Sequence, residues 1–162
     1  MKIAVFVSGR GSNLSALLNY PDLINLIEIV AVVSDKIKCK AFEIAREFGI
    51  KTFSIGQENG KVNQNDITSI LKKLEVDFVV LAGYLKLIPN ELIEKFENKI
   101  VNIHPALLPS FGGKGMYGSY VHRAVFNSSA KVSGATVHMV DKTYDTGKII
   151  AQKCVDISDV KN

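Results

Sequence analysis

The sequence is poor in the features that mark secreted and metal-binding proteins. Its two cysteines, Cys39 and Cys154, lie far apart and belong neither to a CxxC pair nor to a cluster of cysteines and histidines. Isolated cysteines are typical of reduced thiols inside the cell rather than of disulfides or zinc sites. We therefore predict a cytoplasmic protein without disulfides and without a bound metal.

A membrane-spanning segment is also missing. The apolar run at residues 3–8 is far shorter than the roughly 20 residues that an α-helix needs to cross a bilayer. The chain begins directly on this run, with no basic segment and no cleavage site of a secretory signal. We therefore expect a soluble protein with no membrane partner.

Basic residues are not clustered along the chain. The formal net charge is +4, and no long run of lysine and arginine produces it. Nucleic-acid-binding faces usually show such runs, so the charge pattern favours a small anionic ligand and argues against a nucleic-acid partner.

Internal repeats, low-complexity tracts and linkers are absent as well. The chain has 162 residues, of which 47% are apolar and 22% charged, and this is the size and composition of one globular domain with its own core. We predict a single domain over residues 1–162.

What the sequence does contain is an alternation of buried strands and amphipathic helices. Short apolar runs rich in β-branched residues predict strands at residues 2–8, 27–33, 51–54, 76–82 and 100–104. Apolar positions at helical spacing predict helices at residues 14–18, 38–48, 90–96 and 120–126, and one that begins at residue 66. This order predicts an α/β fold with a mostly parallel, doubly wound sheet. Alternating runs at residues 133–141 and 147–155 predict an antiparallel pair at its C-terminal edge.

A glycine loop, SGRGSNL at residues 8–14, follows the first strand. Its glycines permit a tight turn, and Ser12 or Asn13 is expected to cap the helix that follows. Free N–H groups at a helix start favour anions, so a phosphate or carboxylate fits at Gly11, Ser12 and Asn13. The loop lacks the third glycine of a dinucleotide motif and the lysine of a P-loop. A plain strand-to-helix turn stays open as the alternative.

A second candidate loop leaves the strand at residues 76–82 through Gly83. It presents the ring of Tyr84, several aliphatic side chains and the amine of Lys86. A loop of this kind at a strand end can receive a flat aromatic ligand. A packed connector without a ligand is the alternative.

The stretch IVNIHPALLP at residues 100–109 places a polar pair at a strand end. Asn102 and His104 are two residues apart, so both side chains leave the same face of a strand. Pro105 prevents the strand from continuing as a central element. Ligands bind at strand ends in open α/β sheets, although an Asn and a His bonded to backbone would give the same pattern.

Asp145 supplies a third polar group. It lies in the turn between the two last strands, where an Asx turn is the ordinary role for an aspartate. With Asn102 and His104 it would complete a set suited to acyl transfer, in which the amide stabilises an oxyanion and the other two groups move protons. Direct attack by a bound amine requires no Ser or Cys nucleophile. His138, inside an alternating strand, is expected to be structural.

Five segments resemble the phosphoribosylglycinamide formyltransferases, the folate-dependent transformylases of purine synthesis. They are SGRGSNL at 8–14, LAGYLKLIP at 81–89, NIHPALLPSF at 102–111, and SGATVHMVD at 133–141 with DTGKII at 145–150. Their order and combination are far more specific than any single segment. The resemblance implies a Rossmann-like formyltransferase fold, with 10-formyltetrahydrofolate as formyl donor and glycinamide ribonucleotide as acceptor. We expect a monomer or homodimer whose partners are these small molecules.

The resemblance also assigns roles to residues. It implies that Asn102 stabilises the oxyanion and touches the folate, that His104 acts as an electrostatic or general acid group, and that Asp145 orients water and protons. The acceptor phosphate would bind at Gly11, Ser12 and Asn13. The folate would also contact Tyr84, Leu85, Lys86, Leu87 and Ile88, with Lys86 where the family commonly has arginine.

The sequence departs from the family pattern in two places. Lys148 follows Gly147, where the family usually has proline after the glycine. The family also usually continues for one or two helices beyond the position of Asn162, so we expect a domain shortened at its C-terminus.

Other functions share parts of this pattern. Methionyl-tRNA formyltransferase and formyltetrahydrofolate hydrolase contain the central motif but carry an extra domain. A folate- or phosphate-binding module without catalysis is the alternative from a different class.

Overall fold

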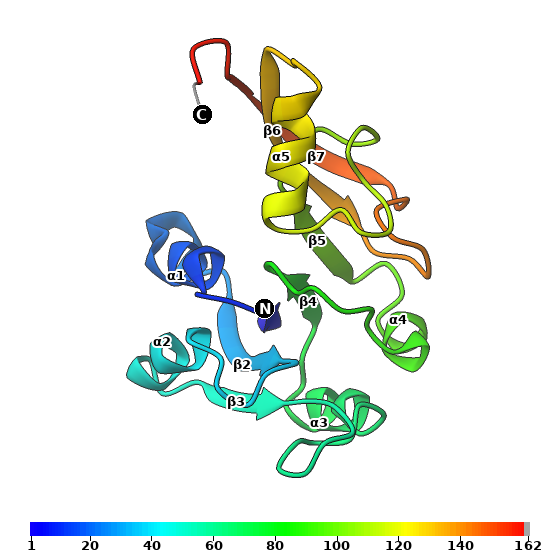
Figure 1. Ribbon diagram of the computed structural model, residues 1–162. Coiled ribbons are helices and arrows are strands. Elements are labelled where there is room, and N and C mark those ends of the chain that lie inside the picture. The colour runs from blue at the N-terminus through cyan, green and yellow to red at the C-terminus, as the bar shows by residue number, and fades with distance from the viewer. Residues whose placement is uncertain (161–162) are drawn as a thin grey trace. The chain divides into compact units, whose positions relative to one another are not determined.

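A computed structural model describes residues 1–160, and the chain divides into two compact units, Met1–Ile100 and Val101–Asn162 (Figure 1). The boundary falls after the first residue of strand β5.

The first unit contains a parallel sheet of four strands. These are β1 (Lys2–Val7), β2 (Glu28–Ser34), β3 (Lys51–Ser54) and β4 (Phe78–Leu81). Strand β1 pairs with β2 and β4, and β2 also pairs with β3, so the order is β3-β2-β1-β4. Residues Ile3–Val7 are buried throughout, as expected for a central parallel strand covered on both faces.

Helices alternate with these strands as the sequence predicts. They are α1 (Ser12–Asn19), α2 (Ala41–Glu47), α3 (Ile67–Lys73) and α4 (Asn90–Lys95), with a short 3₁₀ helix, η1 (Pro21–Leu23), after α1. The expected capping of α1 by Ser12 or Asn13 is wrong. Gly11 occupies the N-cap with φ +83°, and no side chain caps the helix.

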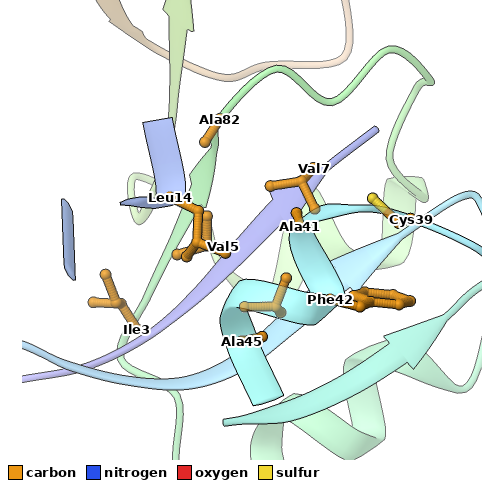
Figure 2. Packing of buried hydrophobic residues seen from close by; sticks show 10 residues of the cluster. Ile3, Val5, Val7, Leu14, Cys39, Ala41, Phe42, Ala45 and Ala82 are labelled. Carbon is orange, nitrogen blue, oxygen red and sulfur yellow. The ribbon is translucent and has the colours of Figure 1, made fainter. Parts of the chain in front are cut away.

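Gly11 takes this position because the chain approaches α2 closely there. A Cβ on Gly11 would lie 2.7 Å from the Cβ of Ala41, and its positive φ suits glycine better than any other residue. Figure 2 shows the apolar cluster to which Ala41 belongs, in which Val5, Leu14 and Phe42 come from β1, α1 and α2. Burial of a side chain of this size stabilises the fold by about 1.5–3 kcal/mol. The packing of α1 in this core therefore determines where the glycine loop ends and the helix begins.

The second unit contains an antiparallel sheet. Strand β5 (Ile100–His104) pairs with β6 (Val132–Met139), and β6 pairs with β7 (Ile149–Asp156). Helix α5 (Ser119–Asn127) buries Val121 and Val125 against Ala106. Parallel strands that alternate with helices, followed by antiparallel strands, confirm the predicted fold class.

The last strand begins later than the sequence predicts. The predicted strand at 147–155 begins at Ile149, because Gly147 and Lys148 belong to the turn. A Cβ on Gly147 would lie 1.8 Å from the carbonyl oxygen of Met139, so only glycine permits this path. Among residues 1–160, no helix is long and apolar enough to cross a membrane.

Candidate active site

The pairing of β5 with β6 places four polar side chains in two rows. Asn102 lies opposite His138, and His104 lies opposite Thr136. Directly opposite residues in an antiparallel pair project from the same face. Since Asn102 and His104 already share a face, all four side chains lie together in the second unit.

The hydrogen bonds of His138 determine the orientation of Asn102. Nδ1 of His138 lies 2.8 Å from the carbonyl oxygen of Met139, and because a carbonyl only accepts, this nitrogen carries the proton. In the neutral ring Nε2 then accepts, and Asn102 Nδ2 donates to it at 3.0 Å. The side-chain amide has two N–H groups, so one remains for a ligand.

His104 is buried between two acceptors. Its Nε2 donates to the carbonyl oxygen of Phe111 at 2.9 Å, and its Nδ1 lies 3.6 Å from Oδ2 of Asp145. A ring protonated at both nitrogens can therefore donate on both sides. The ring is held in place by backbone on one side and a carboxylate on the other.

Asp145 reaches both histidines from the β6–β7 turn. Its Oδ1 lies 3.4 Å from Nε2 of His138, and its Oδ2 accepts the backbone N–H of Gly113 at 2.9 Å. The Asx role falls instead to Asp141, whose Oδ1 accepts the backbone N–H of Thr143 at 2.8 Å. The carboxylate of Asp145 therefore contacts the two histidines and Gly113 instead of closing the turn.

The surroundings of Asp145 favour its ionised form. Burial raises the pKa of this carboxyl, and its side chain is only 10% exposed. When protonated, His138 donates a hydrogen bond to Asp145 and both histidines add positive charge, and the N–H of Gly113 donates to the carboxylate as well. Together these effects outweigh burial and hold the pKa of Asp145 below its ordinary value. Asp145 is therefore a carboxylate at neutral pH.

The glycine-rich segment after β5 fits closely around this carboxylate. A Cβ on Gly112 would lie 2.5 Å from Cδ2 of Leu108 and 3.2 Å from the Cβ of Asp145. Absence of a side chain at position 112 therefore lets Gly113 reach Asp145. Asn102, His104, His138 and Asp145 together form a polar cluster.

The predicted phosphate site lies in the first unit. Gly11 is the buried N-cap of α1, and Ser12 and Asn13 are exposed in its first turn. The N–H groups of a first helical turn have no partner within the helix, and the anion site at this position stays a prediction.

The predicted folate loop borders a cavity of about 630 Å³ in the first unit. Tyr84, Lys86 and Leu87 line it, whereas Leu85 is absent from its lining and Ile88 is buried in the core. Burial and the charge of Asp35 raise the pKa of the Tyr84 hydroxyl, so this ring is neutral. Its centroid lies 5.4 Å from that of Phe6 in an edge-to-face contact.

Two cavity residues carry opposite charges that sequence reasoning did not single out. Lys61 donates to the backbone oxygen of Asp35 at 2.7 Å and forms an ion pair with Glu58 at 3.1 Å. Asp35 follows the carboxyl end of β2. Ligands bind at such strand ends in open α/β sheets, so its place in the sequence could have marked it as a site residue. Lys61 lies in a loop with no periodicity to mark it.

Comparison with known proteins settles the family. The model of the family described as formyl transferase matches residues 1–161. The chain belongs to this family. The resemblance to phosphoribosylglycinamide formyltransferases, which five segments of the sequence carry, is confirmed by the individual relatives.

Two relatives illustrate the similarity in sequence. The chain is 48% identical over 160 residues to the chloroplastic phosphoribosylglycinamide formyltransferase of Vigna unguiculata, covering 96% of this chain and 51% of that protein. It is 40% identical over 162 residues to phosphoribosylglycinamide formyltransferase of Bacillus subtilis, covering 98% of this chain and 80% of that protein. The chain thus spans about half the length of the plant relatives that it matches.

Solved structures of the family agree with the fold. Phosphoribosylglycinamide formyltransferase from Bacillus halodurans superposes with a TM-score of 0.87 at 32% identity, covering all of this chain and 83% of that one. The alternation of strands and helices described above is therefore the fold of the formyl transferase family.

His138 is the residue of the polar cluster that sequence reasoning assigned to structure alone. Its contacts with both Asn102 and Asp145 place it inside the cluster. Spacing within one strand could not show this, because the contact depends on the register between β5 and β6. Within residues 1–160, no group of three or more His, Cys, Asp or Glu side chains is arranged to hold a metal ion.

Proposed function

We propose that this chain transfers a formyl group from 10-formyltetrahydrofolate to the amine of glycinamide ribonucleotide. The observation that carries the proposal is the meeting of Asn102, His104 and Asp145 in one partly buried cluster of a formyl transferase fold. The names of the relatives supply the acceptor, and the folate donor follows from the resemblance of the sequence.

Asn102 is suited to stabilise the oxyanion. Attack of the amine on the formyl carbon forms a new C–N bond and places negative charge on the formyl oxygen. The amide N–H of Asn102 that does not bind His138 can donate to that oxygen. A fixed donor at the developing charge typically accelerates such a reaction by about 10²–10³.

His104 and Asp145 are suited to move the proton. The attacking amine must lose a proton, and the folate nitrogen must gain one as the bond from the formyl carbon to that nitrogen breaks. The ionised Asp145 can accept or orient the proton, directly or through water, and His104 beside it can donate. Atoms and charge balance without an enzyme nucleophile.

The first unit is proposed to hold the substrates. The start of α1 at Gly11, Ser12 and Asn13 is proposed to bind the phosphate of the acceptor, because its backbone N–H groups are free to face an anion. The cavity beside Tyr84, Lys86 and Leu87 is proposed to take part of the folate. Leu85 and Ile88, also predicted to contact the folate, would support this loop, since Leu85 N–H donates to Ser8 Oγ at 3.0 Å and Ile88 is buried.

We further propose that the protein acts in the cytoplasm, as one domain and as a monomer or homodimer. Two isolated cysteines support a reducing compartment.

A coupled measurement tests the reaction. Tetrahydrofolate release by the intact chain should require glycinamide ribonucleotide and should disappear in His104→Ala. His122→Ala, which removes an exposed histidine of α5, is the matched control and should leave the rate unchanged. Release that does not need the ribonucleotide would indicate a hydrolase, and folate binding without release would indicate a binding module.

A further inference from the structure

A second row of polar side chains crosses all three strands of the second unit. Thr136 on β6 lies opposite His104 on β5 and opposite Gln152 on β7. The three side chains therefore project from the same face of the sheet. Gln152 is the member of this row farthest from the polar cluster.

Thr136 and Gln152 form a closed hydrogen-bond network with the segment that follows β5. The hydroxyl of Thr136 donates to the carbonyl oxygen of Ala106 at 2.7 Å and accepts the N–H of Leu108 at 3.0 Å. Nε2 of Gln152 donates to the carbonyl oxygen of Leu108 at 2.9 Å and to the hydroxyl of Thr136 at 3.0 Å. Both N–H groups of the glutamine amide are thus used.

The anchored segment leads directly to two contacts of the polar cluster. Phe111 supplies the carbonyl oxygen that holds His104, and Gly113 supplies the N–H that holds Asp145. Both lie within five residues of Leu108. A shift of Leu108 would therefore displace the groups that orient the histidine and the carboxylate.

We infer that Gln152 and Thr136 are positioning residues for formyl transfer, which hold the segment at residues 106–113 so that its backbone orients His104 and Asp145. The inference rests on the proposed function. Neither side chain needs to touch a substrate. Thr136 is fully buried, and Gln152 acts through the backbone of Leu108.

Substitutions that keep shape but change hydrogen bonding test the inference. Thr136→Val removes the hydroxyl, whereas Thr136→Ser keeps it. Gln152→Met removes both donors, and Gln152→Glu replaces them with a carboxylate that cannot donate to Leu108. Lys153→Met, a change at the adjacent exposed position of β7, is the control.

We expect kcat to fall by about tenfold to 100-fold in Thr136→Val, Gln152→Met and Gln152→Glu, because misplacement of about 1 Å can cost this much. KM should change little, and Thr136→Ser and Lys153→Met should retain activity. Loss of the bond from Gly113 raises the pKa of Asp145. The acid limb of the pH profile should therefore move to higher pH in the three impaired variants alone.

The outcomes separate the inference from the proposed reaction. An inactive wild-type chain would refute the reaction, and titration of Asp145 by ¹³C NMR would then test the positioning role without turnover. A wild-type pKa for Asp145 in Gln152→Met and Gln152→Glu would overturn the inference, as would unchanged kcat in an active chain. If Thr136→Val fails to fold by circular dichroism, the two Gln152 variants decide the question.

Discussion

Two aspartates in one turn show how local contacts divide roles between identical side chains. Asp141 accepts hydrogen bonds from Thr143 and Thr146 and closes the turn. Asp145, four residues later, has φ +56° and directs its carboxylate toward two histidines. Because Asp141 makes the hydrogen bonds of the turn, the carboxylate of Asp145 is available to the histidines.

Replacement of Asn102 by aspartate should remove the oxyanion donor while preserving its shape. We expect turnover to fall by about 10²–10³, and the added negative charge near Asp145 should deepen the loss. Steady-state kinetics of Asn102→Asp measures this. Asn127→Asp, at an exposed position of α5, is the control, and equal rates in both variants would exclude Asn102 as the donor.

Replacement of Asp145 by asparagine should lower turnover at neutral pH. The variant keeps a polar side chain of the same size but cannot take up a proton. We expect turnover to fall by on the order of 10² or more, with circular dichroism unchanged. An unchanged rate would mean that a different carboxylate handles the proton.

The same variant should alter stability in acid. The pKa of Asp145 is lower in the folded state than its ordinary value, so ionised Asp145 stabilises the fold above about pH 4. This contribution is lost as the pH falls through the folded-state pKa. The free energy of unfolding should therefore depend less steeply on pH in Asp145→Asn than in the wild type below about pH 4. Parallel slopes for the two proteins in urea titrations would contradict this.

At the scale of elements, the hairpin of β6 and β7 depends on a glycine inside a strand. A Cβ on Gly134 would lie 2.1 Å from the carbonyl oxygen of Lys153 and 2.7 Å from Cδ2 of Leu107. Backbone cannot yield to this contact without separating the strands. Gly134 thus permits both the pairing of β7 and the close approach of the segment after β5.

Gly134→Ala should therefore destabilise the protein by about 3 kcal/mol or more. Gly115→Ala is the matched comparison, because Gly115 has φ +90° and open space around its Cα. It should cost only the backbone strain of about 1–2 kcal/mol. Chemical denaturation of both variants gives the two values, and a smaller loss for Gly134→Ala would show that β7 pairs differently.

The strands and helices were predictable because each carries its own periodicity. The alternation at β6 and the apolar run at β1 place these strands within one or two residues of their observed bounds. The shared face of Asn102 and His104 also follows from spacing within one strand. His138 did not follow, because its contact with Asn102 depends on the register between β5 and β6, and hydrophobic patterns do not determine that register when both strands carry polar residues on one face.

At the scale of the whole molecule, the two units would have different roles in the proposed reaction. The first unit carries the candidate phosphate and folate sites, and the second carries the polar cluster. The alternation of apolar strands and amphipathic helices predicted the fold class, but a glycine loop without a third glycine left its ligand open. Comparison with the family, not the loop, decides in favour of a formyl transferase.

A stable folate analogue should raise the stability of the chain. Ligand at 100 times its Kd stabilises the folded state by about 2.7 kcal/mol, so thermal unfolding should shift upward with a non-transferable 10-formyltetrahydrofolate analogue. NADH at the same concentration is the control and should produce no shift, because the loop lacks the dinucleotide motif. A shift with NADH and none with the folate would contradict the assignment of the cavity.

The most direct test of the central claim follows the formyl carbon itself. The chain is incubated with glycinamide ribonucleotide and 10-formyltetrahydrofolate labelled with ¹³C in the formyl group, and the products are read by ¹³C NMR. We predict that the label appears on the amine nitrogen of the ribonucleotide in the wild type and remains on the folate in His104→Ala. Label recovered as free formate, or retained on the folate by the wild type, would contradict the proposed transfer.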